Sequence, residues 1–176
     1  MTTGSALSDY HPAIRTVNRL VDIARLGLDR EAERPFLRDL VDRVAHRLDT
    51  PYVVVDALLN DAQVILAGRG PVPEFIQQAG GTPLEWAFCQ PLVTERVART
   101  IEDLEADPLF HDNPLVTVAG LRSYAGAPLV SQSGHVLGGL CGLDVRPRAF
   151  SPGELAFLQA TADEVVERLE ERADRP

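Results

Sequence analysis

Residues 121–145 of this 176-residue chain read LRSYAGAPLVSQSGHVLGGLCGLDV. Two runs of small, apolar and β-forming residues, 123–130 and 136–145, flank the turn-forming sequence Ser131-Gln132-Ser133-Gly134. This pattern is typical of two antiparallel strands joined by a tight turn. The stretch therefore predicts a hairpin at the heart of an antiparallel sheet.

A second hairpin is predicted closer to the N-terminus. Pro51 ends a helical pattern, and the run Tyr52-Val53-Val54-Val55 opens a strand directly behind it. Asn60-Asp61 is typical of a turn, and residues 63–67 supply the returning strand. A further strand is expected over residues 97–101, where apolar and polar residues alternate loosely.

Apolar residues at spacings of three and four predict helices near both ends of the chain. One helix is expected from His11 and another after Pro35, while Ser151-Pro152-Gly153-Glu154 is a capping box that starts the closing helix. A short helix is also expected to begin at Asp107-Pro108 and to end at Pro114. The three long apolar stripes are Ile14, Val17, Val21, Ala24 and Leu28; Phe36, Leu37, Leu40, Val41, Val44, Ala45 and Leu48; and Leu155, Leu158, Ala162, Val165 and Leu169.

These elements describe an α+β domain with an antiparallel sheet. Apolar residues make up 45% of the chain and charged residues 24%, which is ordinary for a globular protein. A chain of this length fits one domain with one continuous core. We expect that domain over residues 11–173, after a flexible tail over residues 1–10.

Charge and targeting signals narrow the classes of function. The formal net charge is -9, lysine is absent, and the arginines are scattered among carboxylates, which disfavours nucleic-acid binding. No apolar run approaches the roughly 20 residues of a membrane span, and the N-terminus lacks a signal-peptide pattern. Two cysteines are too few for a disulfide framework. We expect a cytoplasmic protein, and the lysine-free composition is typical of GC-rich bacterial genomes.

Several phrases occur together and in a fixed order over residues 26–171. They are Leu26-Gly27-Leu28-Asp29, Trp86-Ala87-Phe88-Cys89, the acidic and aromatic run 107–116 with Asn113-Pro114-Leu115-Val116 at its end, the strand 121–129, the run 134–144, and Arg146-Pro147-Arg148. Together they resemble the GAF domain of bacterial signalling proteins. In that family Ser-Phe-Cys is usual where this chain has Ala87-Phe88-Cys89.

The resemblance implies a six-stranded antiparallel sheet with helices from both chain termini packed on one face. It also implies a ligand cavity on the opposite face, roofed by the middle helices and loops. GAF cavities hold cyclic nucleotides, haem, bilins, small metabolites or nothing, so the cofactor stays unknown at this point.

Aromatic and apolar residues with a few polar groups are expected to line this cavity, as in small-molecule sites generally. Packing of the same aromatic residues in the core is the alternative, and it is favoured for Phe88. The predicted pocket residues are Trp86, Cys89, Phe110, His111, Asn113, Leu115, Arg122, Tyr124 and Cys141.

Cys89 and Cys141 admit two interpretations. They can form a redox switch, or they can be buried and behave as small hydrophobic residues; the second is favoured because reactive thiols need an exposed, electropositive setting. Free methionine sulfoxide reductases share the fold but use cysteines in loops above the pocket, so no enzymatic activity is expected. His111 is the only candidate haem ligand and is expected at the surface, and the isolated histidines predict no metal site.

Extra apolar residues broaden the stripes of both terminal helices and predict a homodimer. The candidate interface residues are Ile14, Val17, Leu20, Val21, Phe157, Leu158, Val165 and Leu169. We therefore expect a stand-alone sensory or regulatory domain that binds a small molecule and signals through an unidentified partner protein. A protein-interaction module with a collapsed cavity is the alternative, and a thiol redox sensor or a methionine sulfoxide reductase-like enzyme is a distant third.

Overall fold

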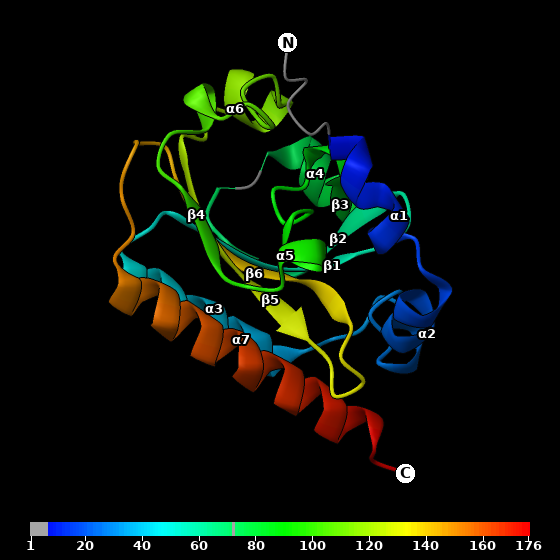
Figure 1. Cartoon of the computed structure of the whole chain (residues 1–176). Coiled ribbons are helices and arrows are strands. Elements are labelled where there is room, and N and C mark those ends of the chain that lie inside the picture. Colours follow the sequence, from blue (N-terminus) through cyan, green and yellow to red (C-terminus); the bar gives the residue numbers. More distant parts are fainter. Residues whose placement is uncertain (1–6, 72) are drawn as a thin grey trace.

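The computed structural model describes residues 7–71 and 73–176, apart from the side chain of Phe75, and is built on a six-stranded antiparallel sheet (Figure 1). The strands lie in the order β3-β2-β1-β6-β5-β4. Both predicted hairpins are confirmed, because β1 pairs with β2 and β5 with β6, and β1 and β6 meet at the centre of the sheet. The strands are β1 (Tyr52–Leu58), β2 (Ala62–Arg69), β3 (Gly81–Pro83), β4 (Arg99–Ile101), β5 (Ser123–Val130) and β6 (Val136–Asp144).

Two long helices cover one face of the sheet (Figure 1). Helix α3 (Pro35–Leu48) packs on β1 and β2, and α7 (Pro152–Ala173) packs on β5 and β6. The predicted capping box starts α7: the Glu154 N–H donates to Ser151 Oγ at 3.1 Å, and the Ser151 N–H donates to Glu154 Oε2 at 2.7 Å. The predicted apolar faces of both helices form the core against the sheet; its fully buried side chains include Leu37, Val44, Val53, Val55, Leu140, Leu158, Ala162 and Val165.

The N-terminal helical segment differs from its prediction. It consists of α1 (His11–Ile14) and α2 (Val17–Arg25), interrupted at residues 15–16, and not one continuous helix. In α2 the buried residues are Arg19, Asp22 and Ile23. Val17 and Val21 are 72% and 61% exposed, because α2 lies beside the ends of the central strands β1 and β6 and turns polar residues towards them.

The predicted dimer residues fall into three groups. Ile14, Leu158, Val165 and Leu169 are buried in the core of the single chain and offer no surface to a second copy. Leu20 and Phe157 are half-buried. Val17 and Val21, described above, are exposed. Homodimer formation stays a prediction, with its available apolar surface on α2.

Short elements and loops cover the other face of the sheet. Strand β3, with Gly81 and Pro83 at its ends, was not predicted because both residue types are rare in strands. A second core cluster, which includes Leu84, Phe88, Leu92 and Phe110, packs between this layer and the sheet. The short elements are η1 (Leu7–Tyr10), α1, α4 (Glu74–Ala79), η2 (Leu84–Trp86), α5 (Leu92–Glu95), η3 (Leu104–Ala106) and α6 (Pro114–Thr117).

Two further sequence predictions are corrected here. Asp107 does not start a helix; its side chain accepts a hydrogen bond from the Leu109 N–H at 2.9 Å in a turn. Pro114 begins a helix and does not end one, because Asn113 caps α6 and Pro114 takes the first helical position. Residues 7–10 of the predicted tail form η1, and residues 1–6 lie outside the described residues.

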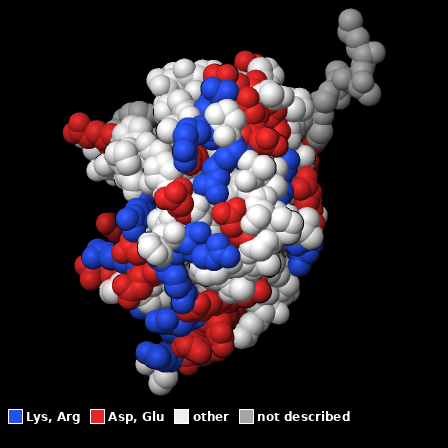
Figure 2. Space-filling model, turned by 90° about the vertical axis from the view of Figure 1, so that its left-hand side faces the viewer, with Lys and Arg blue, Asp and Glu red and all other residues white. Residues whose placement is uncertain are grey.

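On the face that Figure 2 presents, the described arginines and carboxylates intermingle, as their alternation in the sequence predicts. One such exposed pair joins the two long helices, with Arg43 Nη2 2.6 Å from Glu164 Oε2. Within the described residues, no helix combines the length and the apolar character that a membrane span requires.

Candidate functional site

The face of the sheet opposite α3 and α7 borders a cavity of about 690 Å³. Strands β1, β2, β5 and β6 contribute its floor, and the segments around α4 and α6 contribute walls. Its volume lies within the range of small-molecule sites. Most described lining residues are apolar or aromatic, including Tyr52, Val54, Ile65, Ile76, Phe88, Leu115, Leu121, Tyr124 and Leu143; the polar ones are Asp56, Gln63, Gln77, Thr82, Cys89 and Cys141.

Asp56 lies on the cavity floor, on β1, at a point where the register with β2 shifts. Its Oδ1 accepts a hydrogen bond from the Gly139 N–H at 2.9 Å, and its Oδ2 accepts one from Gln63 Nε2 at 2.7 Å. Gln63 is held in turn, because its Oε1 accepts from Thr82 Oγ1 at 2.7 Å. Burial raises the pKa of the Asp56 carboxyl to about 6 against the opposing effect of these hydrogen bonds. An oriented carboxyl whose pKa is raised by burial therefore lies on the cavity floor.

Two thiols adjoin this carboxyl. Cys89 follows η2 and Cys141 lies on β6, yet their Sγ atoms are only 2.7 Å apart. The Cys89 thiol donates to Asp56 Oδ2 at 3.2 Å, and the Tyr124 hydroxyl lies 3.4 Å from Cys89 Sγ. Burial raises the pKa of both thiols and of Tyr124, so all three groups stay protonated at neutral pH.

The same carboxyl and thiols form a donor set for a metal ion, since their ligand atoms lie within 4.8 Å of one another. Carboxylate and thiolate ligands both suit zinc. Two thiolates bound to one zinc ion at about 2.3 Å would lie roughly 3.8 Å apart. The Sγ atoms of Cys89 and Cys141 are 2.7 Å apart, so this arrangement fits direct sulfur contact better than a shared metal.

The described lining of the cavity carries one kind of charge only. Asp56 carries the single carboxyl group among these residues, and none of them is an arginine or a histidine. Anionic ligands such as phosphates are bound in proteins by cationic side chains or by clustered N–H groups. An anionic ligand in the cavity would therefore lie near the Asp56 carboxylate, with no cationic side chain in the described lining to compensate its charge.

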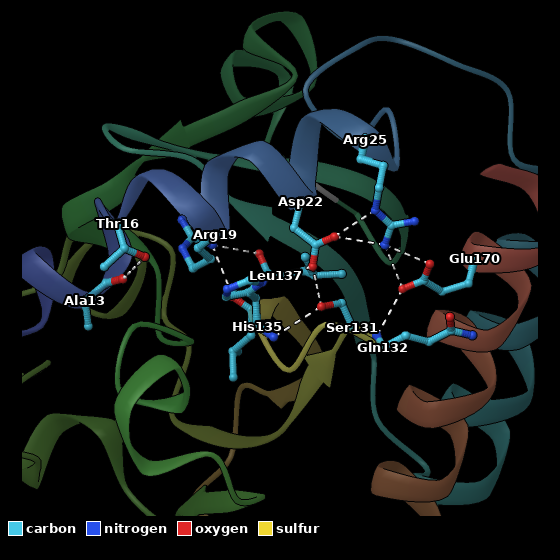
Figure 3. A network of polar contacts seen from close by, with 11 residues as sticks. Ala13, Thr16, Arg19, Asp22, Arg25, Ser131, Gln132, His135, Leu137 and Glu170 are labelled. Atoms are coloured by element: carbon cyan, nitrogen blue, oxygen red, sulfur yellow. Dashed lines mark hydrogen bonds and ion pairs between the residues drawn. The ribbon is translucent and has the colours of Figure 1, made fainter. Parts of the chain in front are cut away.

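A second buried polar cluster joins α2, the β5–β6 turn and α7 (Figure 3). Asp22 on α2 accepts hydrogen bonds from Ser131 Oγ and from Arg25 Nε, the latter at 3.0 Å, and it lies 3.2 Å from His135 Nδ1. Arg25 also contacts Glu170 of α7, with Nη2 and Oε2 2.8 Å apart. Burial raises the pKa of Asp22, but the hydrogen bonds outweigh it and the pKa is lowered overall.

Arg19, one helical turn before Asp22, is only 2% exposed and points into the same region (Figure 3). Its guanidinium donates to the carbonyls of Ile14, at 2.7 Å, of Val136, at 3.2 Å, and also of Leu58 and Leu137. Burial lowers its pKa to about 10, which leaves it protonated at neutral pH. One cation thus ties the ends of α1, β1 and β6 together.

Comparison with known families decides the identity of the fold. The family model described as "GAF domain" matches residues 34–169, which is most of the chain. The chain belongs to the GAF domain family. The six-stranded antiparallel sheet and the helix layer implied by the resemblance are therefore confirmed.

Relatives of this GAF domain occur in proteins of different kinds. Among curated proteins, the cyclic di-GMP phosphodiesterase PA2567 of Pseudomonas aeruginosa is 29% identical over 154 residues, which is 86% of this chain. The match spans only 25% of that protein's length.

Solved structures support the fold alone, since their sequence identities are low. A type II free methionine-R-sulfoxide reductase from Thermoplasma acidophilum is similar with a TM-score of 0.64 and 16% identity, over 78% of this chain and 92% of that one. The GAF domain of an Acinetobacter phosphoenolpyruvate-protein phosphotransferase is similar with a TM-score of 0.63 and 16% identity, over 92% of this chain and 98% of that one.

Four of the nine predicted pocket residues line the cavity of this GAF domain: Cys89, Leu115, Tyr124 and Cys141. The structure brings Cys89, Tyr124 and Cys141 together on the floor and places Leu115 in the wall. Phe110 is fully buried outside the lining, where its ring packs edge-on against Phe88 at 5.1 Å between centroids. Phe88 itself reaches the cavity, so it both packs in the core and lines the pocket.

The other predicted residues have structural contacts outside the lining. Asn113 caps α6 and donates from Nδ2 to the carbonyl of Trp86 at 3.1 Å, which joins two segments of the roof. Arg122 pairs with Asp103, with Nε and Oδ1 3.0 Å apart. His111 is exposed, and its Nδ1 lies 3.0 Å from the carbonyl oxygen of Asp107.

The most distinctive floor residue, Asp56, was missed by the sequence analysis. It stands within the run YVVVDAL of β1, where every neighbour is apolar or aromatic. A charged residue inside a buried strand is uncommon unless it is hydrogen-bonded, and that was the available signal. Gln63 and Thr82 could not be found in the same way, because their side chains meet only through the pairing of β2 with β3.

Proposed function

We propose that this GAF domain is a sensor whose cavity binds an uncharged, largely apolar small molecule. The observation that carries the proposal is the described lining, which encloses about 690 Å³ with apolar side chains, one carboxyl and no cationic group. Burial of an apolar ligand surface against such a lining is favourable, whereas a phosphate group beside Asp56 would be desolvated without a partner.

The name of the Pseudomonas relative refers to cyclic di-GMP, which carries two phosphates. The lining argues against extending that ligand to the cavity described here. The polar groups at the floor favour a ligand with an N–H or carbonyl edge instead, because Gln63, Thr82 and Tyr124 all border the cavity. These groups would fix the orientation of a flat ligand, and the apolar walls would supply most of its affinity.

Two alternatives receive less support. A protein-interaction module with a collapsed cavity requires a filled core opposite α3 and α7, which is where the cavity lies. Catalysis of the sulfoxide reductase kind requires an accessible thiolate, and burial raises the pKa of both cysteine thiols. Binding, and not turnover, is the function that this geometry favours.

We further propose that ligand binding is relayed through β6 to the helix layer and from there to a partner protein. Cys141 of β6 borders the cavity, while Leu140, the preceding residue, is buried in the core against α3 and α7. A ligand that displaces β6 therefore shifts the surface on which α7 rests. The exposed Val17 and Val21 on α2 supply an apolar surface for homodimer formation or for the partner.

Two measurements test the ligand proposal. Native mass spectrometry of freshly purified protein is expected to show a small uncharged adduct, together with the oligomeric state. A neutral apolar dye such as Nile red is expected to bind the ligand-free protein, and cyclic di-GMP is expected not to compete with it. Competition by cyclic di-GMP at comparable concentration would contradict the uncharged-ligand proposal.

A matched pair of variants locates the binding. Ala119 lines the cavity and its neighbour Val118 does not, although both are exposed and so tolerate a large side chain. Ala119→Trp is expected to weaken dye binding by about tenfold or more, which corresponds to about 1.4 kcal/mol, and Val118→Trp to leave it within about twofold. Equal binding by both variants would place the dye outside the cavity.

A further inference from the structure

The chain contains two cysteines, and the fold brings them together from segments 52 residues apart. Cys89 belongs to the loop that follows η2, and Cys141 lies on the central strand β6. Cys89 and Cys141 are only 1% and 2% exposed and both border the cavity, so the cavity is the side from which a small molecule would approach them. The interpretation favoured from the sequence, two buried cysteines that behave as small hydrophobic residues, does not account for this pairing, whereas the alternative of a redox switch requires it.

The distance between the two sulfur atoms can be compared with the distances expected for a disulfide bond and for a shared zinc ion. Two sulfur atoms in simple van der Waals contact lie about 3.6 Å apart. The Sγ atoms of Cys89 and Cys141 lie 2.7 Å apart, and a disulfide bond is about 2.05 Å long. The thiols therefore need to approach by only about 0.7 Å to bond, whereas a shared zinc ion would require them to separate by about 1 Å.

Glycines provide the space that the sulfur atoms occupy. A Cβ atom on Gly139 would lie 2.7 Å from Cys89 Sγ and 3.3 Å from Cys141 Sγ. A Cβ atom on Gly126 would lie 1.9 Å from the hydroxyl oxygen of Tyr124, which is 3.4 Å from Cys89 Sγ and 3.7 Å from Cys141 Sγ. The floor of the cavity is thus hollowed at the two positions that allow the thiols and the hydroxyl to meet.

Of the two thiols, Cys89 is the one that is hydrogen-bonded to the carboxyl of Asp56. The Cys89 thiol donates its hydrogen bond to Asp56 Oδ2 at 3.2 Å. Asp56 is oriented by Gln63 and by the Gly139 N–H, and no arginine or histidine lines the described cavity to neutralise it. Cys89 is therefore the thiol whose proton can leave as its sulfur attacks an electrophile.

We propose that Cys89 and Cys141 form a reversible dithiol–disulfide couple in the cavity floor, oxidised by a small hydroperoxide that enters the cavity. Cys89 Sγ attacks the distal oxygen of the hydroperoxide, the O–O bond breaks, and the thiol proton passes through Asp56 to the departing alkoxide or hydroxide. The products are a sulfenic acid on Cys89 and an alcohol or water. Cys141 Sγ then attacks the Cys89 sulfur, the S–O bond breaks, and water leaves with the Cys141 proton.

The balance of this sequence is two thiols and one hydroperoxide giving one disulfide, one alcohol or water molecule, and one further water molecule. Reduction by an added dithiol returns both thiols. Burial raises the pKa of both cysteines, which keeps the reaction slow compared with that of an exposed thiolate and confines it to oxidants that fit the cavity. The disulfide would tether the loop after η2 to β6 and so alter the cavity that the proposed ligand uses.

Mass analysis of the folded 176-residue chain tests this proposal directly. Reduced protein is treated with hydrogen peroxide, unreacted thiols are alkylated, and the protein is digested without reduction. We expect a mass loss of about 2 Da, a cross-linked peptide that contains Cys89 and Cys141, and full reversal by dithiothreitol. Two alkylated thiols after oxidation, a disulfide between two chains only, or a tightly bound zinc ion that prevents oxidation would each overturn the proposal.

Two variants separate the roles within the couple, with circular dichroism confirming that each is folded. Cys141→Ser is expected to stop at the sulfenic acid, with a mass gain of about 16 Da and no cross-link. Asp56→Asn is expected to slow disulfide formation by about tenfold or more while the final yield is unchanged. An unchanged rate in Asp56→Asn would overturn the assignment of Asp56 as proton acceptor. Because dye binding by the reduced protein is measured separately, failure of the couple leaves the ligand proposal standing.

Discussion

Two buried aspartates of this GAF domain have opposite electrostatic settings. Asp22 joins α2 to the β5–β6 turn and to α7 among Arg25, His135 and Ser131, and its pKa is lowered overall. Asp56 lies on the cavity floor, where its partners are uncharged and burial raises its pKa to about 6. A carboxylate with cationic partners stabilises the contact between the elements that carry them. A carboxylate without such partners remains able to bind a proton or a ligand.

The difference follows from where each residue lies. The joint around Asp22 fastens three elements, and Arg25, Asp22 and Glu170 form one continuous charge network within it. Asp56, by contrast, lies on the floor of the cavity. An ion-pair network like that of Asp22 would need arginine side chains there, and these would occupy the cavity. Strongly perturbed ionisable groups tend to mark functional sites, and Asp56 with its two thiols is that group here.

The largest expected effect is at Arg19, the buried cation that ties the ends of α1, β1 and β6 together. Arg19→Leu removes the donor from several buried carbonyls and is expected to lower the free energy of unfolding by about 3–5 kcal/mol. Urea unfolding measures this change. The matched control is Arg15→Leu, whose exposed guanidinium donates to the Asn60 carbonyl and to no other acceptor among the described residues, and whose loss is expected to cost less than about 1 kcal/mol. Similar stability of the two variants would show that the hydrogen bonds from Arg19 to the buried carbonyls contribute little to the free energy of unfolding.

Asp56→Asn is expected to stabilise the protein above pH 6. The folded pKa of Asp56, about 6, lies above its usual value of 3.8, so its contribution to stability is present at low pH and is lost as the pH rises towards 6. That loss of stability is about 3 kcal/mol. The Asp56→Asn variant avoids the loss because asparagine is uncharged. The Nδ2 group of Asn at position 56 can donate to the side-chain oxygen of Gln63 once the Gln63 amide has reoriented. Unfolding free energies at pH 4 and pH 8 measure it, and a variant less stable than the wild type at pH 8 would contradict the expectation.

Asp22→Asn is expected to act in the opposite direction. Because the folded pKa of Asp22 is lowered, its contribution is present above the unfolded pKa and is lost as the pH falls. The variant is expected to be less stable by about 2 kcal/mol at pH 8 and to approach the wild type in acid. Unfolding free energies at pH 4 and pH 8 again measure the effect. If the variants at positions 22 and 56 changed in stability in the same direction with pH, the proposed difference between the two clusters would be contradicted.

The smallest expected effect concerns the space on the cavity floor. Gly139→Ala places a methyl group against Cys89 Sγ and within 3.1 Å of Leu92 Cδ1, and it is expected to lower the free energy of unfolding by about 1–2 kcal/mol. Gly153→Ala, in the first turn of α7 with its nearest neighbour at 3.9 Å, is the control and is expected to be neutral or slightly stabilising. Thermal unfolding of both variants decides whether the floor is tightly packed around the thiols.

Local signals made most of the fold predictable. The turn at residues 131–134 and the capping box at Ser151 each specify their element through neighbours in the sequence, and the structure has both as expected. The α2 face could not be predicted in this way, because apolar spacing favoured burial of Val17 and Val21. Arg19 is buried in their place, since its donors meet carbonyls of distant strands that no local pattern reveals.

The candidate site was less predictable for the same physical reason. Cys89, Tyr124 and Cys141 were found because they lie in phrases that resemble the family, and all three line the cavity. Their closeness, and the role of Asp56 between them, depend on strand register and on a loop that crosses the sheet. Contacts between residues far apart in the sequence leave no periodic trace in it.

The outer strands of the sheet have a consequence for solubility. At the two borders, β3 and β4 are three residues long each, and Pro83 removes one amide donor from β3. Long, flat borders invite strands of other molecules to add on and begin aggregation. Here each outermost strand is only three residues long, so a strand of another molecule could add to β3 or β4 over no more than a few hydrogen bonds.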